Sequence, residues 1–313
     1  MPELYHSMLK LPPWFQNQTG VPGSDTPEGL RFAPDALTFY VDPGHSMTSD
    51  DNDGTDPNEP KTSIQSAVTA AVTGRGDVIV LAPGRHAPTA AITLNKAGLT
   101  LVAQPYGCNP QQPEASTWIY PTAAWATGPV FIITAPCALI GLVVVARVAA
   151  HGPTNLTTGA HIAQDGDAAG EAGGFCYFKN CRFVDWFGTP YGIFVWGASY
   201  NRYESCQFES FTGAGLAFGA RVRNPTFNDV VDCTFRNCVN GIEHIAGATH
   251  QDFLFRENFF IDYTDAIDFN NQAANGLVAG NWYETATGVA TYDIAVAAAQ
   301  ALGINFSGNR YTE

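Results

Sequence analysis

The sequence has little charge and very little lysine. Charged residues make up 14% of the 313 residues, whereas about a quarter is usual in soluble domains. The net charge is −14, and the only lysines are Lys10, Lys61, Lys96 and Lys179. No basic stripe is available to follow a phosphate backbone or an anionic bilayer, so we expect neither nucleic acid nor a membrane as a partner.

Long apolar runs and paired cysteines are also missing. No apolar run approaches the ~18 residues that a membrane-spanning helix needs. The opening MPELYHSMLKLPPWFQ has no positive segment followed by an apolar core, so we expect no secretory signal. Seven cysteines are an odd number, and three of them recur at one repeat position. We therefore interpret the cysteines as reduced core residues of a protein made in the cytoplasm.

Glycine and aromatic residues are abundant, and they indicate a chain of strands and turns. The chain has 31 glycines and 12% aromatic residues, and apolar residues make up 45% of it. From Gly76 onward, short apolar runs such as VIVL, LTLVA and VFIIT follow one another with Gly, Pro and Asn between them. None is long enough for a helix, so the pattern predicts an all-β domain.

The chain divides into three parts by composition. Residues 1–36 are rich in proline and predict an extended arm, for which a disordered leader and an anchor on another protein are the two interpretations. We favour the anchor, and its apolar contact residues would be Leu9, Leu11, Trp14 and Phe15. Residues 37–86 predict a cap, and residues 87–313 predict the coils, with an inserted loop at 147–174.

The cap contains one predicted helix, over residues 62–73. Ile64, Ala67, Val68, Ala71 and Val72 recur at helical spacing and form one apolar stripe. Thr62 or Ser63 can cap its first turn, and Gly74 can end it. An amphipathic helix of this kind can cover the open N-terminal end of a stack of strands.

A repeat of about 25 residues is clear from residue 176 onward. The tetrapeptides NCRF, SCQF, DCTF, ENFF, GNWY and GNRY follow one another at intervals of 25, 27, 25, 23 and 28 residues. Their second position is a column of small or amide residues: Cys181, Cys206, Cys233, Asn258, Asn281 and Asn309. Their fourth position is an aromatic column: Phe183, Phe208, Phe235, Phe260, Tyr283 and Tyr311.

Such columns are typical of a right-handed single-stranded parallel β-helix. Parallel strands of neighbouring coils stack about 4.8 Å apart, so equivalent residues lie one above the other. Aromatic rings can stack at that spacing, and a buried Asn can bond the Asn and backbone of the next coil. A second column, Ile193, Leu216, Ile242 and Ile267, predicts another inward-facing strand in each coil.

Residues 39–86 also resemble the opening of pectate-lyase-like β-helix proteins. The resemblance rests on Gly54-Thr55, Ile64-Gln65, Gly76-Asp77 and Pro83-Gly84, with His86 where tyrosine is common. It implies a pectin-lyase-like fold, which hosts lyases, hydrolases, adhesins and bacteriophage virion proteins alike. Lyases of this family use Asp residues around calcium with an arginine base, and hydrolases use paired Asp motifs that the repeat strands here do not contain.

The best candidate catalytic pair is Glu243 and Asp268. Both are second in their predicted strands, on adjacent coils, so we expect the side chains to lie about 5–6 Å apart. That separation suits a retaining glycosidase pair. The alternative interpretation, two solvated carboxylates on an acidic surface, is the one we favour. His244 falls in an inward column and predicts a core histidine.

Three further patterns have both a functional and an ordinary interpretation. Asp51, Asp53 and Asp56 resemble a calcium loop, although Ser49 takes the first ligand position, so self-bonded turns compete with bound Ca²⁺. Arg75-Gly76-Asp77 spells an adhesion tripeptide but also fits a turn. The tryptophans that could form a sugar platform or pack in a core or subunit interface are Trp186, Trp196 and Trp282.

The expected lack of an export signal, the predicted arm and the lack of a recognisable catalytic set favour a non-catalytic protein of a larger assembly. The resemblance to β-helix proteins implies that this assembly is a bacteriophage virion. We expect a capsid decoration, head-spike or tail-associated β-helix that packs as a homotrimer and binds a capsid or tail protein through its arm. A surface glycan is a further candidate partner, and no cofactor other than Ca²⁺ is considered. The alternative is a carbohydrate lyase, glycoside hydrolase or tailspike depolymerase.

Overall fold

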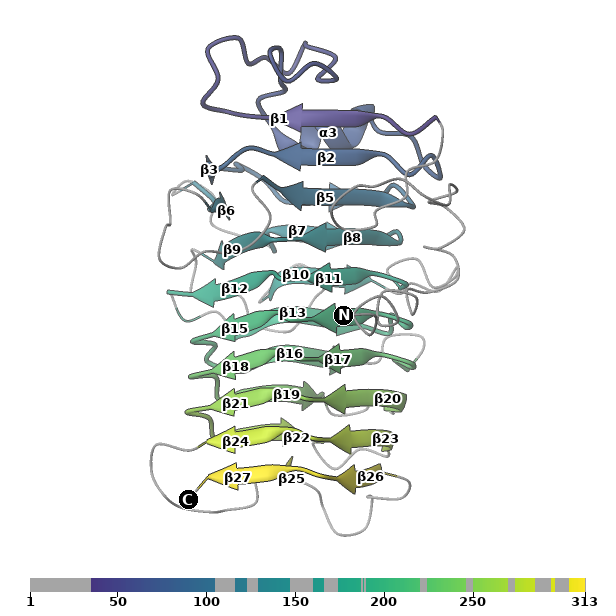
Figure 1. Cartoon of the computed structure of the whole chain (residues 1–313), viewed down its shortest axis with the longest axis vertical. Coiled ribbons are helices and arrows are strands. Elements are labelled where there is room, and N and C mark those ends of the chain that lie inside the picture. The colour runs from purple at the N-terminus through teal and green to yellow at the C-terminus, as the bar shows by residue number, and fades with distance from the viewer. Residues whose placement is uncertain are drawn as a thin grey trace, which may run out of the picture.

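The computed structural model describes residues 35–104, 116–122, 129–146, 160–165, 174–186, 188, 190–219, 224–245, 250–269, 274–284, 294–295 and 304–312. In this part of the chain the protein is a right-handed parallel β-helix (Figure 1). Each coil contributes a strand to each of three sheets, and every strand pairs in parallel with the same strand of the next coil. The predicted fold class is confirmed.

The three sheets run the length of the stack. Sheet A contains β1 (Thr38–Val41), β2 (Val78–Leu81), β5 (Leu99–Ala103), β8 (Cys137–Ile140), β11 (Tyr177–Lys179), β14 (Arg202–Glu204), β17 (Asp229–Val231), β20 (His250–Arg256), β23 (Ala274–Ala279) and β26 (Ile304–Ser307). Sheet B contains β3 (Gly84–His86), β6 (Thr117–Ile119), β9 (Leu142–Ala146), β12 (Arg182–Asp185), β15 (Gln207–Glu209), β18 (Thr234–Arg236), β21 (Phe259–Ile261), β24 (Trp282–Glu284) and β27 (Arg310–Thr312). Sheet C contains β4 (Ile92–Leu94), β7 (Phe131–Ile133), β10 (Ala160–Asp165), β13 (Tyr191–Trp196), β16 (Ala214–Gly219), β19 (Asn240–His244), β22 (Asp265–Asp268) and β25 (Ile294–Ala295).

Helix α3 (Ile64–Ala70) lies at the N-terminal end of the stack and buries Ile64, Ala67 and Val68. The predicted span of 62–73 was too long at both ends. Ser63 is the N-cap and accepts a hydrogen bond from the Ser66 backbone N–H. The helix ends early because the Asp77 carboxylate accepts the N–H of Val72 at 2.8 Å. Val72 is consequently 49% exposed rather than part of the buried stripe. No helix of the described residues is long and apolar enough to cross a bilayer.

The bend between sheets A and B explains the column of Cys and Asn. The residue just before each ladder position has a positive φ, for example 51° at Ser205 and 58° at Glu257, so the chain turns sharply there. Asn281 then accepts hydrogen bonds through Oδ1 from the backbone N–H and the side-chain amide of Asn258. Its own Nδ2 donates to the Phe255 carbonyl. The predicted amide ladder therefore satisfies buried backbone groups as well as itself.

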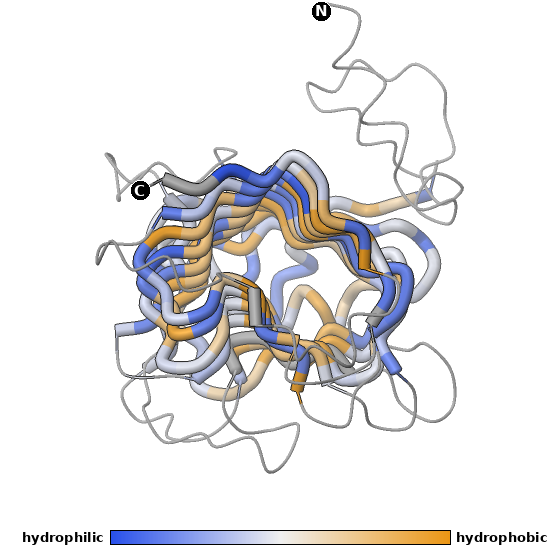
Figure 2. The backbone as a smooth tube through the Cα atoms, turned by 90° about the horizontal axis from the view of Figure 1, so that it is seen from below, coloured by the Kyte–Doolittle hydropathy of each residue, from blue (hydrophilic) through white to orange (hydrophobic). Residues whose placement is uncertain are grey.

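Figure 2 looks along the stack and shows the backbones of successive coils lying one over another. The aromatic column is buried in the interior beside that bend. The rings of Phe183, Phe208, Phe235 and Phe260 stack with centroids 4.8–5.0 Å apart. Sequence reasoning missed the column that makes room for them. Residues 192, 215 and 241 are glycines in register on sheet C, and a Cβ on Gly241 would lie 2.5 Å from the Phe260 ring.

One predicted boundary needs correction. Residues 147–174 were expected to be a single inserted loop, but strand β10 lies within this range. It pairs with β7 on one side and β13 on the other, so sheet C continues through the segment. The spacing analysis missed it because AHIAQD lacks the aromatic and glycine pattern of the later coils.

Large apolar side chains are exposed to solvent near the last described coil. Phe306 is in register with Val278, which is fully buried, yet Phe306 is 43% exposed. On the outer face of sheet B, Phe259 is also exposed and stacks with Trp282 at 5.7 Å. These side chains form two exposed apolar surfaces near the C-terminal end of the described stack.

Candidate functional site

The predicted carboxylate pair lies on the outer face of sheet C. Glu243 of β19 and Asp268 of β22 are register partners on adjacent strands, and both side chains are partly exposed. Their neighbours in sequence, Ile242 and Ile267, point into the core because strand residues alternate between faces. The structure therefore brings together the two acids that the spacing predicted.

The environment distinguishes Glu243 from an ordinary surface acid. Burial raises its pKa, and the nearby Asp268 carboxylate raises it further, while a hydrogen bond with the Asn240 side chain lowers it. Burial and a nearby like charge favour the protonated form of a carboxyl group, which is the form that can donate a proton. Paired carboxyl groups about 5 Å apart are the arrangement of retaining glycosidases.

Aromatic side chains adjoin this pair on the same face. Tyr191, Phe194 and Trp196 project outward from β13, with ring centroids 5.3 Å and 5.0 Å apart in succession. The residues in register with Tyr191 and Phe194 on the next strand are Ala214 and Ala217. Burial raises the pKa of Tyr191 to about 12, with a further contribution from the Glu243 charge. We call Tyr191, Phe194, Trp196, Glu243 and Asp268 the sheet C site.

A second aromatic cluster lies on sheet B near the N-terminal end. Trp186 is 56% exposed, and its ring lies 6.1 Å from Trp118 and 6.0 Å from Tyr120. The guanidinium of Arg85 stacks over the Tyr120 ring at 4.3 Å. We call these four residues the sheet B platform. The three tryptophans considered together from sequence lie apart: Trp186 on this platform, Trp196 on sheet C, and Trp282 further along sheet B.

The acidic loop holds a lysine at its centre. The Nζ of Lys61 donates to the backbone carbonyls of Asp50 at 3.1 Å and Asn52 at 2.5 Å. Asp53 accepts from the backbone and hydroxyl of Thr55, which lowers the pKa of its carboxyl group. These are carbonyl and carboxylate groups of the kind that hold calcium, but an ammonium group and local turns already satisfy them.

The other members of that loop fit the same interpretation. Asp56 accepts from the backbone and side chain of Asn58, and the backbone N–H of Asp51 donates to Ser49. Within the described ranges, no three His, Cys, Asp or Glu side chains are grouped closely enough to hold a metal ion. The residues of this loop do not fit the candidate Ca²⁺ site, and they form the self-bonded turns that were the favoured interpretation of the sequence.

The Arg75-Gly76-Asp77 tripeptide is part of the cap. Arg75 forms two hydrogen bonds with the fully buried Asp77, at 2.6 and 2.7 Å. Asp77 also accepts the backbone N–H groups of Leu37 and Val72. Because the carboxylate is occupied inside the protein, it is not presented for recognition by a receptor.

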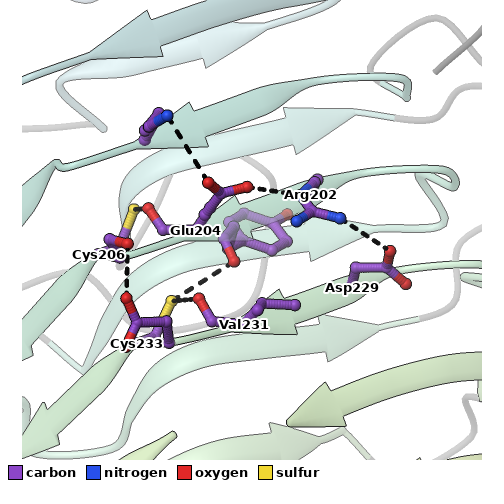
Figure 3. A network of polar contacts seen from close by, with 10 residues as sticks. Arg202, Glu204, Cys206, Asp229, Val231 and Cys233 are labelled. Atoms are coloured by element: carbon purple, nitrogen blue, oxygen red, sulfur yellow. Dashed lines mark hydrogen bonds and ion pairs between the residues drawn. The ribbon is translucent and has the colours of Figure 1, made fainter. Parts of the chain in front are cut away.

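Charged side chains on sheet A are paired between coils. Arg202 donates to Glu204 at 2.8 Å and lies 3.7 Å from Asp229 on the next strand (Figure 3). Glu204 is also 3.7 Å from Lys179 on the preceding strand. On sheet B, Arg182 pairs with Glu209 of the neighbouring coil at 2.6 Å. Three of these four ion pairs join successive coils, and the Arg202–Glu204 pair lies within β14.

Two polar features inside the stack were missed from sequence. A second amide ladder lies at the entrance to sheet A, where the Asn228 Oδ1 accepts from the backbone and side chain of Asn201. Asn228 also contacts His250, and His250 contacts His244. His244 is fully buried, as its inward column predicted, but its pairing with a second histidine was not foreseen.

The candidate anchoring residues Leu9, Leu11, Trp14 and Phe15 lie outside the described part of the chain. The anchor therefore stays a prediction. The same holds for the side chain of Tyr311 at the end of the aromatic column, although its backbone pairs with Tyr283 as expected.

Comparisons with known proteins agree with the fold. A family model described as a right handed beta helix region matches residues 157–292. The solved structures similar to this chain include a PL6 family alginate lyase, with a TM-score of 0.51 and 14% identity over 93% of this chain and 41% of that one. At this identity the likeness shows the fold alone.

Viral proteins are also among the similar structures. ORF18 of Geobacillus virus E2 has a TM-score of 0.44 and 13% identity, over 88% of this chain and 60% of that one. A tailspike protein of Acinetobacter baumannii bacteriophage Fri1, a capsular polysaccharide depolymerase, has a TM-score of 0.41 and 10% identity, over 90% and 63%. The chain thus spans less than two thirds of each viral protein. A search of curated proteins finds no match to the sequence.

Proposed function

We propose that the protein is a non-catalytic structural β-helix of a bacteriophage particle, attached to the capsid or tail. One observation carries this proposal: three described ion pairs, Lys179–Glu204, Arg202–Asp229 and Arg182–Glu209, join neighbouring coils. The Lys179–Glu204–Arg202–Asp229 chain on sheet A spans three successive strands. A surface built in this way supports a rigid, extended body.

The exposed apolar surfaces fit contacts between chains in such an assembly: lateral contacts at Phe259 on the outer face of sheet B, and end-on contacts at Phe306, which is in register with the buried Val278. Phe259 and Phe306 are each more than two-fifths exposed, at 44% and 43%. Aromatic side chains of this kind are enriched where proteins contact one another. A homotrimer is the assembly we propose, and residues 1–36 are its proposed attachment to the particle. The resemblance of residues 39–86 to openings found in virion β-helix proteins supports the same setting.

The test is particle association of the full chain and of a chain lacking residues 1–36. The proposal expects the full chain to co-sediment with particles and the shortened chain to stay in solution as a folded oligomer. A shortened chain that still binds particles would refute the anchor. Light scattering should give a mass near three times 33.5 kDa for the full chain, and three times its own smaller monomer mass for the shortened chain.

The sheet C site supports a second candidate, action on or binding of a polysaccharide. The observation is the raised pKa of Glu243 beside Asp268, next to outward aromatic rings. Glu243 would act as the acid and Asp268 as the nucleophile of a retaining hydrolysis. Aromatic faces can stack on sugar rings, and the sheet B platform offers the same chemistry with an added arginine.

One experiment distinguishes the structural protein from the polysaccharide hydrolase. A hydrolase should depolymerise acidic or neutral polysaccharides and lose at least ~100-fold in rate with Glu243→Gln or Asp268→Asn. A structural protein should show no depolymerisation in any of the three chains. Trp186→Ala tests the platform. A glycan that stacks there should bind more weakly to this variant, while the rate of any depolymerisation at saturating glycan should stay unchanged.

A further inference from the structure

The core of the coils around β19 and β20 contains two histidines in contact with each other. His250 Nδ1 lies 3.1 Å from His244 Nε2, and His250 Nε2 lies 3.2 Å from the Asn228 amide nitrogen. Both imidazoles are completely buried. A β-bulge between His250 and Phe253 places His250 against the inward-facing His244.

The hydrogen bonds fix the tautomers of both rings. The Asn228 Oδ1 accepts from Asn201, so the Asn228 NH₂ group faces His250. An amide NH₂ only donates, so His250 Nε2 accepts and the proton of this neutral ring is on Nδ1. That N–H donates to His244 Nε2, which leaves the His244 proton on Nδ1. This nitrogen is buried without a hydrogen-bond partner among the described residues.

Neither ring has room for a second proton. A proton on His244 Nε2 would face the N–H of His250, and a proton on His250 Nε2 would face the NH₂ of Asn228. Each protonation therefore replaces a hydrogen bond by two opposed donors. The surrounding side chains are aromatic: Phe218, Phe253, Phe255 and Phe269.

Among the described residues, no opposite charge acts on either ring to compensate. Glu243, the residue before His244, points to the outer face of sheet C. Burial lowers the pKa of His244 to about 3, with no carboxylate or cation contributing. Burial also lowers the pKa of His250 well below its usual value, and among the residues that the structure describes His244 lowers it further.

We propose that the His244–His250 pair makes this β-helix acid-sensitive, so that its coils from β19 to β22 open first when the pH falls. In the unfolded chain both rings bind protons below about pH 6.5, whereas in the folded chain they stay neutral. Acidification therefore favours unfolding. Stability is fully present above the unfolded pKa and is lost as the pH falls below it. Well below pH 6.5 each ring changes the unfolding equilibrium constant about tenfold per pH unit, so the pair contributes about a thousandfold between pH 7.5 and 5.

The test is urea unfolding at pH 7.5 and pH 5.0 of the full chain and of His244→Gln. Glutamine does not titrate and can accept the His250 N–H through its side-chain oxygen. On acidification, the unfolding equilibrium constant of the variant should rise by a factor about 30-fold smaller than that of the natural chain, because one of the two titrating rings is gone. His45→Gln, in the N-terminal loop, should match the natural chain. Equal losses in the natural chain and His244→Gln would overturn the proposal.

A second measurement needs no variant. Hydrogen exchange of the natural chain, corrected for the intrinsic effect of pH, should show residues 240–269 losing protection at pH 5.0 before residues 78–103. Buried His86, whose pKa burial also lowers, lies in the N-terminal coils and provides the comparison. Uniform loss, or loss that begins at 78–103, would place the acid-sensitive element elsewhere and refute the proposal.

Discussion

Replacing Asn281 by alanine should be among the most damaging single changes in the stack. Its Oδ1 accepts from the backbone N–H of Asn258 at 2.9 Å and from that residue's amide at 3.0 Å. Its Nδ2 donates to the Phe255 carbonyl at 3.0 Å. Asn281→Ala leaves the Asn258 N–H and the Phe255 carbonyl buried without these partners.

The expected loss follows from those two backbone groups. An unpaired buried donor or acceptor costs about 1–3 kcal/mol, so the loss of partners for two such groups should lower the free energy of unfolding by about 2–6 kcal/mol. That is a large part of the 5–15 kcal/mol, in order of magnitude, that stabilises an ordinary domain. Urea unfolding followed by circular dichroism measures the difference through the transition midpoint.

The matched control is Asn305→Ala, which removes the same amide group from an exposed position of β26. It should change the free energy of unfolding by less than about 0.5 kcal/mol. If Asn281→Ala proved as stable as this control, the amide ladder would not support the backbone, and the explanation of the repeat given above would be wrong.

Three further changes test other parts of the structure. Gly215→Ala should destabilise the fold by about 1–3 kcal/mol in urea unfolding, because the new Cβ would lie 2.8 Å from Phe208 Cβ. Unchanged stability would refute the fit between the glycine column and the aromatic column. Nuclear magnetic resonance titration should find the pKa of Glu243 above its usual value and lower in Asp268→Asn, where the neighbouring negative charge is gone; the same value in both chains would contradict their coupling. Chelators should leave the melting temperature unchanged because the ammonium of Lys61 occupies the acidic loop, and a melting temperature that falls with chelator and recovers with calcium would show a metal site.

Periodicity was enough to predict the repeat positions of the later coils. Phe208 and Phe235 are register partners, as are Ile242 and Ile267, because each coil must place the same residue type at the same height. Glu243 and Asp268 were placed together by the same reasoning. The spacing of residues along the chain is sufficient to predict which residues become register partners wherever successive coils have nearly the same length.

The remaining features depend on irregular geometry that spacing does not encode. The His244–His250 contact requires the bulge within β20, which shifts the register by local backbone conformation. The sheet B platform joins Arg85 to Trp186 across coils of unequal length, where the sequence shows no clear repeat. The end of α3 was set by a carboxylate five residues further along the chain from Val72, at Asp77.

The most direct test of the proposed role is the protein content of purified virus particles whose genome encodes this chain. Quantitative mass spectrometry should find the chain as a fixed component, in a copy number divisible by three. Particles that lack the chain should degrade polysaccharide as fast as complete particles. Absence of the chain from purified particles, together with depolymerisation of a polysaccharide by the isolated protein, would contradict the structural role and favour the enzyme.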